Sequence, residues 1–173
     1  MSRLFVKLAF PLSVFLFTLI PSLGAIAAER VVIRYHNHRI PIRVSELSEF
    51  SRTGRMSLSL QAYFRVSGQD PQRMRTALNR EVPVNAVTLS RTLNSPLGLM
   101  VLNPLGEVIT TPSNRANTES LRGALVTSAL NDNRVSLIEV IENYPTEEVH
   151  IHGDRILETY QTMARIINPI RLF

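Results

Sequence analysis

The four histidines are the residues whose chemistry stands out first. They occur as two His-x-His pairs, His36 with His38 and His150 with His152. Residues two apart on a β-strand point to the same face, so each pair could present two imidazoles side by side. If the two segments were neighbours in a sheet, four imidazoles could converge on one ion, a ligand set that suits zinc or copper. Glu148, on the same face as His150, could add a carboxylate.

A turn explains the first histidine pair without a metal. The string His36-Asn37-His38 separates two β-branched segments, residues 30–35 and 39–44, and Asn37 tolerates the left-handed backbone of a hairpin tip. Exposed polar side chains are expected at such a tip. We therefore keep the zinc or copper site as an alternative, and the residues indicate no other cofactor.

Two adjacent carboxylates, Glu147 and Glu148, are a further candidate for acid–base chemistry. Adjacent residues on a strand point to opposite faces, so these two cannot flank one substrate atom without a bulge. The pattern favours solvation or capping for Glu147.

Composition excludes several mechanisms. Lys7 is the single lysine and the chain has no cysteine, so the rest of the chain can form no Schiff base, no phosphate-loop lysine contact and no thiolate site. Without Arg3 and Lys7, 17 of the 19 basic residues remain against 14 acidic ones. The arginines are scattered rather than clustered, which argues against a nucleic-acid partner and leaves an anionic membrane surface open.

Residues 1–27 have the features of a secretory signal peptide. Arg3 and Lys7 precede an apolar run, residues 8–20, and Ala25-Ile26-Ala27 fits an A-x-A cleavage site. We expect export to the periplasm or the extracellular space. If the segment were not cleaved it would anchor the protein in a membrane, although prolines, serines and a glycine interrupt it.

The spacing of the apolar residues, together with the positions of glycine, proline and capping residues, predicts a helical body between strands. Pro41 places the second hairpin strand at a sheet edge, and residues 147–152 alternate like a further strand. Gly54 is expected to end the first helix, and Asn103-Pro104 to disturb a later one. Helix starts are expected at Ser45, Ser57, Asp70, Asn85, Ser95 and either Asn117 or Thr118, with a last helix capped by Asp154.

These elements predict the α+β class. We expect a mostly helical body of short helices with a small antiparallel sheet, made of the N-terminal hairpin and the strand near residues 147–152. Residues 28–168 would form a single accessory domain, followed by a C-terminal tail at residues 169–173.

Three stretches carry a family resemblance. They are Ala-Glu-Arg-Val-Val-Ile-Arg-Tyr at 28–35, Ser-Arg-x-Leu-Asn-Ser-Pro-Leu-Gly at 90–98 and Tyr-Pro-Thr-Glu-Glu-Val-x-Ile at 144–151. With them the chain resembles a domain of unknown function of photosynthetic bacteria, which often follows a signal peptide and precedes a dienelactone-hydrolase-like α/β-hydrolase domain. The hydrolase domain itself is not expected in this chain.

The resemblance implies an association with hydrolysis, but the catalytic pattern is missing. An α/β-hydrolase needs a nucleophile elbow, G-x-S-x-G, and the sequence contains none. Ser95 is the nearest imitation, yet Pro96 removes the backbone N–H that an oxyanion hole would use. Ser95 fits better as a helix N-cap before a first-turn proline.

The residues and the resemblance together favour an exported, non-catalytic accessory module, and leave enzymatic activity undecided. Its partner would be a separately encoded hydrolase, another envelope protein or an apolar ligand between its helices. An apolar cavity would be lined by residues such as Phe64, Met74, Met100 and Met163. The alternatives are the histidine metal site and a hydrolase-associated domain with weak esterase activity.

Overall fold

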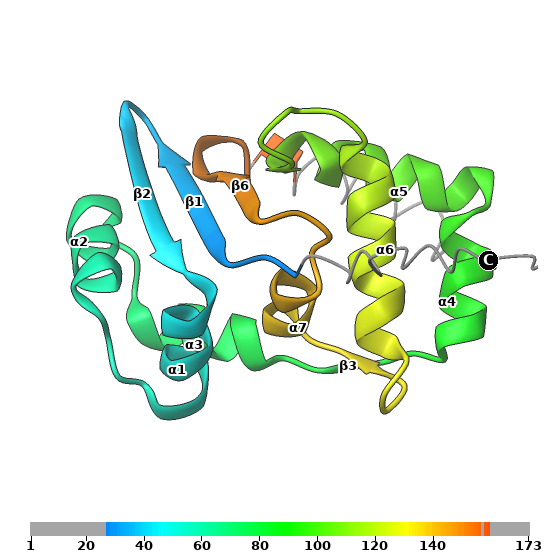
Figure 1. Cartoon of the computed structure of the whole chain (residues 1–173), viewed down its shortest axis with the longest axis horizontal. Coiled ribbons are helices and arrows are strands. Elements are labelled where there is room, and N and C mark those ends of the chain that lie inside the picture. The colour runs from blue at the N-terminus through cyan, green and yellow to red at the C-terminus, as the bar shows by residue number, and fades with distance from the viewer. Residues whose placement is uncertain (1–26, 157, 160–173) are drawn as a thin grey trace, which may run out of the picture.

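A hairpin and two strands from distant parts of the sequence form one four-stranded sheet in the computed structural model of this chain (Figure 1). The structure describes residues 27–156, 158 and 159. The expected signal segment, the last helix and the C-terminal tail fall almost entirely outside these residues. The strand order is β2-β1-β6-β4, with bounds His38–Arg43, Arg30–Tyr35, Glu148–His152 and Ile109–Thr110.

The sheet joins the expected hairpin to a parallel neighbour. Strands β1 and β2 are antiparallel, with Pro41 opposite Val32, and β2 lies at the edge as predicted. Strands β4 and β6 are also antiparallel, but β6 runs parallel to β1. The α+β class is confirmed, whereas one strand pair differs from the antiparallel arrangement we expected. A parallel pair needs a long crossover, and the helices between β2 and β6 supply it.

The sheet has one apolar face and one polar face. Val31 and Ile33 of β1 and Val149 of β6 point to the same face and are buried. Their neighbours Arg34 and His152 point to the opposite face, because side chains alternate along a strand. The apolar face anchors the sheet to the helices, and polar chemistry is left for the other face.

Seven helices and a second small sheet complete the described part of the chain. In Figure 1, α1, α2 and α3 gather near the hairpin, α4, α5 and α6 lie at the opposite end, and α7 lies between. The helices are α1 Val44–Thr53, α2 Leu58–Ser67, α3 Pro71–Asn79, α4 Ala86–Leu93, α5 Pro96–Val108, α6 Asn117–Ala129 and α7 Leu137–Glu142. Strands β3 (Val82–Pro83) and β5 (Arg134–Val135) pair with each other, and a 3₁₀ turn, Gly153–Arg155, follows β6.

Side-chain caps start four helices where the sequence predicted them. In each of them a side-chain oxygen of the cap residue accepts a backbone N–H of the first turn. The four cap residues are Ser57, Asp70, Asn85 and Ser95. Gly54 ends α1 in the left-handed conformation, also as predicted.

Two predicted helix caps are wrong, although both helices begin within one residue of the predicted place. Helix α1 begins at Val44, directly after β2, with Arg43 at the N-cap, so Ser45 lies inside the first turn. Helix α6 begins at Asn117 after Ala116, whose backbone is left-handed. Asn117 is not a cap because its side chain turns back to the preceding loop and accepts the Thr111 N–H at 3.0 Å.

Helix α5 continues through Asn103 and Pro104, where we expected a break. Pro104 removes the hydrogen bond to the Met100 carbonyl, and Met100 lies on the exposed surface, where water can replace it. Leu102 and Val108, on either side of the proline, are buried and hold the helix in place. Within the described residues, no helix is long and apolar enough to cross a membrane.

Candidate binding cavity

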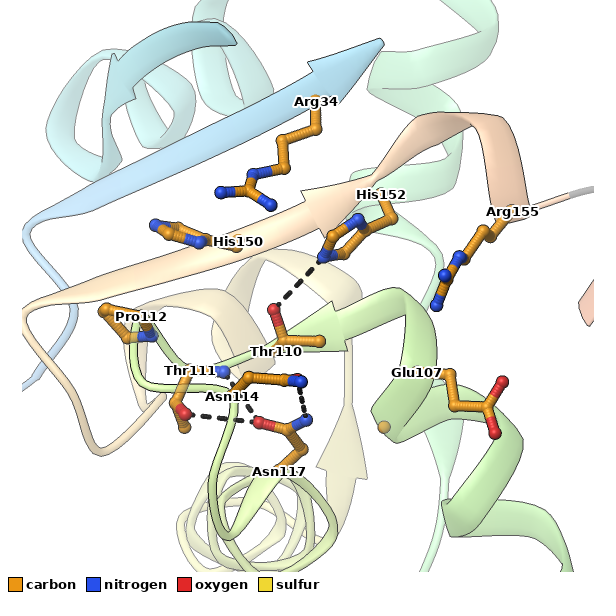
Figure 2. Close-up of a pocket in the computed structure, with 11 residues that line it drawn as sticks. Arg34, Glu107, Thr110, Thr111, Pro112, Asn114, Asn117, His150, His152 and Arg155 are labelled. Carbon is orange, nitrogen blue, oxygen red and sulfur yellow. Dashed lines mark hydrogen bonds between the residues drawn. The ribbon is translucent and has the colours of Figure 1, made fainter. Parts of the chain in front are cut away.

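A polar cavity of about 360 Å³ lies on the polar face of the sheet, where β6 and β4 meet α5 and the loop before α6 (Figure 2). This volume is at the lower end of the range for small-molecule sites. Eleven residues line it: Arg34, Gly106, Glu107, Thr110, Thr111, Pro112, Asn114, Asn117, His150, His152 and Arg155.

Strand register brings the cavity's principal side chains together. Arg34 of β1 lies beside His152 of the parallel strand β6, and Thr110 of β4 lies opposite His150. These four residues point to the polar face, as Figure 2 shows for the arginine and the two imidazoles. Three strands from distant parts of the sequence are therefore needed to assemble the group.

The loop between β4 and α6 forms another wall and is held by its own hydrogen bonds. Asn117 accepts the Thr111 N–H at 3.0 Å and donates to the Asn114 Oδ1 at 2.8 Å (Figure 2). The Thr111 hydroxyl donates to the Arg115 carbonyl at 2.8 Å. The loop side of the cavity therefore has a fixed shape.

A close approach of two helices fixes the third wall. A Cβ added at Gly106 of α5 would lie 3.2 Å from the Thr118 hydroxyl of α6. Such a contact is tighter than ordinary van der Waals packing. The glycine therefore lets α5 reach α6 beside the cavity.

Arginine groups dominate the charge of the cavity. The Nε atom of Arg34 is buried and has no hydrogen-bond partner in the described part of the chain. Burial, and then the positive charges of Arg34 and Arg155, hold the pKa of His152 below its ordinary value of 6.5. His150 acts in the same direction, and Asp154 opposes it. His152 is therefore mainly neutral at neutral pH.

One hydroxyl and one imidazole in the cavity form a candidate nucleophile and base. The Thr110 hydroxyl lies 3.4 Å from the His152 Nε2 atom. Thr110 lines the cavity but is only 3 % exposed, so its hydroxyl has little of the access that a nucleophile needs. Ser95 does not line the cavity. Its hydroxyl donates to the Thr92 carbonyl at 2.7 Å and accepts the Gly98 N–H at 3.3 Å, as an N-cap does.

A second cavity, of about 250 Å³, lies between α1 and the start of α2. Its carboxylates already have partners: Glu46 is 2.7 Å from Arg43, and Glu49 pairs with both Arg52 and Arg55. It offers no buried, unpaired group to a ligand. The cavity beside Arg34 is therefore the better candidate site.

The four histidines do not converge. His150 and His152 line the cavity on one face of β6, as the sequence predicted. His36 and His38 flank the hairpin tip, and His36, not Asn37, has the left-handed backbone. The His36 N–H donates to Asp154 at 2.8 Å.

No group of three or more histidine, cysteine or acidic residues within the described chain could hold a metal ion. The four-histidine geometry is therefore not found.

The candidate carboxylates are held by one arginine. Arg30 contacts Glu147 at 2.9 Å and Glu148 at 3.0 Å. Glu148 also lies 3.4 Å from His150, on the face that the sequence predicted. Because their charges are compensated by Arg30, the two carboxylates form no acid–base pair in the cavity.

The residues suggested for an apolar cavity lie elsewhere. Phe64 is buried in the core and Met74 packs against it, while Met100 is exposed. None of these three lines either cavity, and Met163 lies outside the described residues. The lining around Arg34 is polar instead.

Sequence reasoning missed most of the cavity. Arg34 is a charged residue within a predicted strand. Thr110 belongs to a strand of two residues, which is too short to predict from the sequence. The alternation of β1 places Arg34 opposite the buried face, and this was the one usable signal. The loop residues Asn114 and Asn117 gave none.

Comparison with known families gives one match. A family model described as "Alpha/beta hydrolase of unknown function (DUF1400)" matches residues 27–152. The matched segment includes β1, β6 and every residue that lines the cavity except Arg155. No curated protein and no solved structure matches the chain.

Proposed function

The chain belongs to this family of alpha/beta hydrolases of unknown function, and we propose that within the family it is an exported accessory module. It binds a small polar ligand and does not convert that ligand chemically. The ligand site is the cavity beside Arg34. Export rests on the signal-like residues 1–27.

The observation that carries the proposal is the chemistry of the cavity lining. Two arginines, two histidines and several hydroxyl and amide groups surround a space of about 360 Å³. The hydroxyl that contacts an imidazole belongs to Thr110, a residue that is only 3 % exposed. Binding needs such donors, whereas nucleophilic catalysis needs an accessible nucleophile as well.

The family description makes hydrolysis the natural competitor, and one assay separates the two functions. Purified mature protein is incubated with p-nitrophenyl esters beside Ser95→Ala and His152→Gln. We expect the same background rate from all three, because no accessible nucleophile lies beside His152. A wild-type rate above background that either substitution abolishes would overturn the proposal.

Export has a separate readout. Removal of residues 1–27 would leave a chain that begins at Ala28. Intact-mass measurement of the protein from the envelope or medium should give the mass of residues 28–173. The full-length mass in a membrane fraction would instead support an anchored protein, and proteins that co-purify from that fraction would identify its partner.

A further inference from the structure

We infer that the cavity is an oxyanion site, in which Arg34 binds the carboxylate or phosphate group of a small ligand. The inference rests on the proposed binding function and specifies the chemistry of its ligand. Its structural basis is the juxtaposition of Arg34, Arg155, His150 and His152 around one cavity.

The cavity lining carries more positive than negative charge. Two guanidinium groups line the cavity against a single carboxylate, that of Glu107. Glu107 is exposed on α5 and lies on the far side of the cavity from Arg34 and His150 in Figure 2. The other acidic groups nearby are engaged: Glu148 contacts Arg30 at 3.0 Å, and Asp154 accepts the His36 N–H. An anion would therefore enter a positive environment.

Arg34 has an unpaired donor within the described part of the chain. Arginine donates through five N–H groups and accepts none, so the buried Nε of Arg34 needs an acceptor. A donor without a partner costs free energy. The Nε atom itself is covered by protein, so a ligand oxygen would instead bond to the terminal N–H groups of the same guanidinium, and Arg34 lines the cavity. The planar guanidinium matches the two oxygens of a carboxylate or phosphate, and such charge-assisted pairs are stronger than neutral ones.

Two histidines, His150 and His152, line the cavity together with Arg34. Charged and polar groups from several elements surround His152. They are Arg34 on β1, His150 on the same strand as His152, Arg155 and Asp154 on the 3₁₀ turn, Thr110 on β4, and Glu107 on α5 across the cavity. An imidazole that takes up a proton here becomes a further donor and positive charge. Oxyanion binding and proton uptake should therefore reinforce each other.

The test follows the imidazole resonances of the full mature chain by ¹H–¹⁵N NMR at about pH 6. Succinate, inorganic phosphate and the neutral analogue succinamide are titrated separately into the millimolar range. We expect succinate or phosphate to shift the resonances of His150 and His152, with those of the hairpin residues His36 and His38 as internal references. A response to succinate alone identifies a carboxylate ligand, and one to phosphate alone a phosphate ligand.

Two variants tie any response to the site. Arg34→Gln should weaken binding roughly ten- to a hundredfold, the usual range for a lost charge-assisted contact. Arg155→Gln, at an exposed position of the 3₁₀ turn, should weaken it without a cost to folding. Arg91→Gln, an exposed arginine of α4 outside the cavity, is the matched control and should bind as the wild type does.

The outcomes separate the inference from the proposed function. If succinamide binds at the histidines and the two anions do not, the site binds a neutral ligand and only the oxyanion inference fails. If neither anion shifts His150 and His152, or if Arg34→Gln and Arg155→Gln bind as tightly as Arg91→Gln, the inference is also overturned. Ester hydrolysis by the wild type would instead remove the proposed function.

Discussion

For single residues, the sequence predicted which side chains share a face of a strand better than it predicted which residues lie side by side in space. His150 and His152 were predicted to share a face, and both line the cavity. The sequence predicted the turn at His36 and His38 but not its backbone bond to Asp154, because that contact joins residues far apart in the chain. It also gave no sign that Arg34 lies beside His152, since this neighbour relation depends on strand register.

Ser95 should matter for stability and not for chemistry. Its hydroxyl caps α5 and also bonds to the Thr92 carbonyl, so Ser95→Ala should lower the free energy of unfolding by about 1 kcal/mol. Urea unfolding measures this loss. Ser95→Thr should keep most of the cap, which makes it the matched control. An unchanged unfolding midpoint in Ser95→Ala would contradict the capping role.

His152 should make the protein sensitive to acid. Its pKa is held below 6.5 in the folded chain, mainly by burial and by Arg34, so between that lowered pKa and 6.5 the unfolded chain binds more protons. The free energy of unfolding should therefore be fully retained above about pH 6.5 and should fall below it. Chemical unfolding across this range, in buffers without carboxylate or phosphate, measures the loss.

A variant pair assigns the acid loss to one imidazole. His152→Gln should lose less stability than the wild type as the pH falls. His38→Gln makes the same chemical change at the exposed end of the hairpin and should follow the wild type. If the free energy of unfolding falls equally with pH in the wild type and in His152→Gln, another group causes the loss.

At the scale of elements, residues 90–98 form a tight corner between α4 and α5. Asn94 ends α4, Ser95 caps α5 and Pro96 is the first residue of α5, and the sequence predicted the start of α5 correctly. The sequence did not reveal the role of Gly98. A Cβ there would lie 2.2 Å from the Thr92 carbonyl oxygen and 2.5 Å from the Leu93 Cα. Only glycine permits this approach of the two helices.

A pair of glycine substitutions tests this corner. Gly98→Ala should destabilise the protein by at least about 1–3 kcal/mol, because the new methyl group meets backbone atoms that cannot move aside locally. Gly123→Ala, on the exposed side of α6 with nothing within 4 Å of the added atom, should stabilise it by roughly 0.5–1 kcal/mol. Thermal or urea unfolding of the two variants gives the comparison. Equal changes in the free energy of unfolding would show that helix propensity, and not the close contact at the corner, determines the effect of Gly98→Ala.

At the scale of the whole molecule, the α+β class could be predicted, and the direction of β6 could not. Alternation identifies which residues face the core but carries no information on whether two strands run parallel. The parallel pairing of β1 with β6 brings Arg34 beside His152, and the antiparallel pairing of β4 adds Thr110. The short strands β3, β4 and β5 are two residues each, too short for a periodic signal. The cavity is therefore a product of chain topology that no local pattern encodes.

Monomethyl succinate tests in one sample whether this cavity binds its ligand and whether it leaves the ligand unconverted. The molecule carries a carboxylate for Arg34 and an ester that a hydrolase could cleave. Proton NMR of this ester with the purified mature chain follows binding through line broadening and hydrolysis through released methanol. We predict broadened succinyl lines and methanol at the buffer rate. Methanol released faster than in buffer, with the excess lost in His152→Gln, would contradict the account.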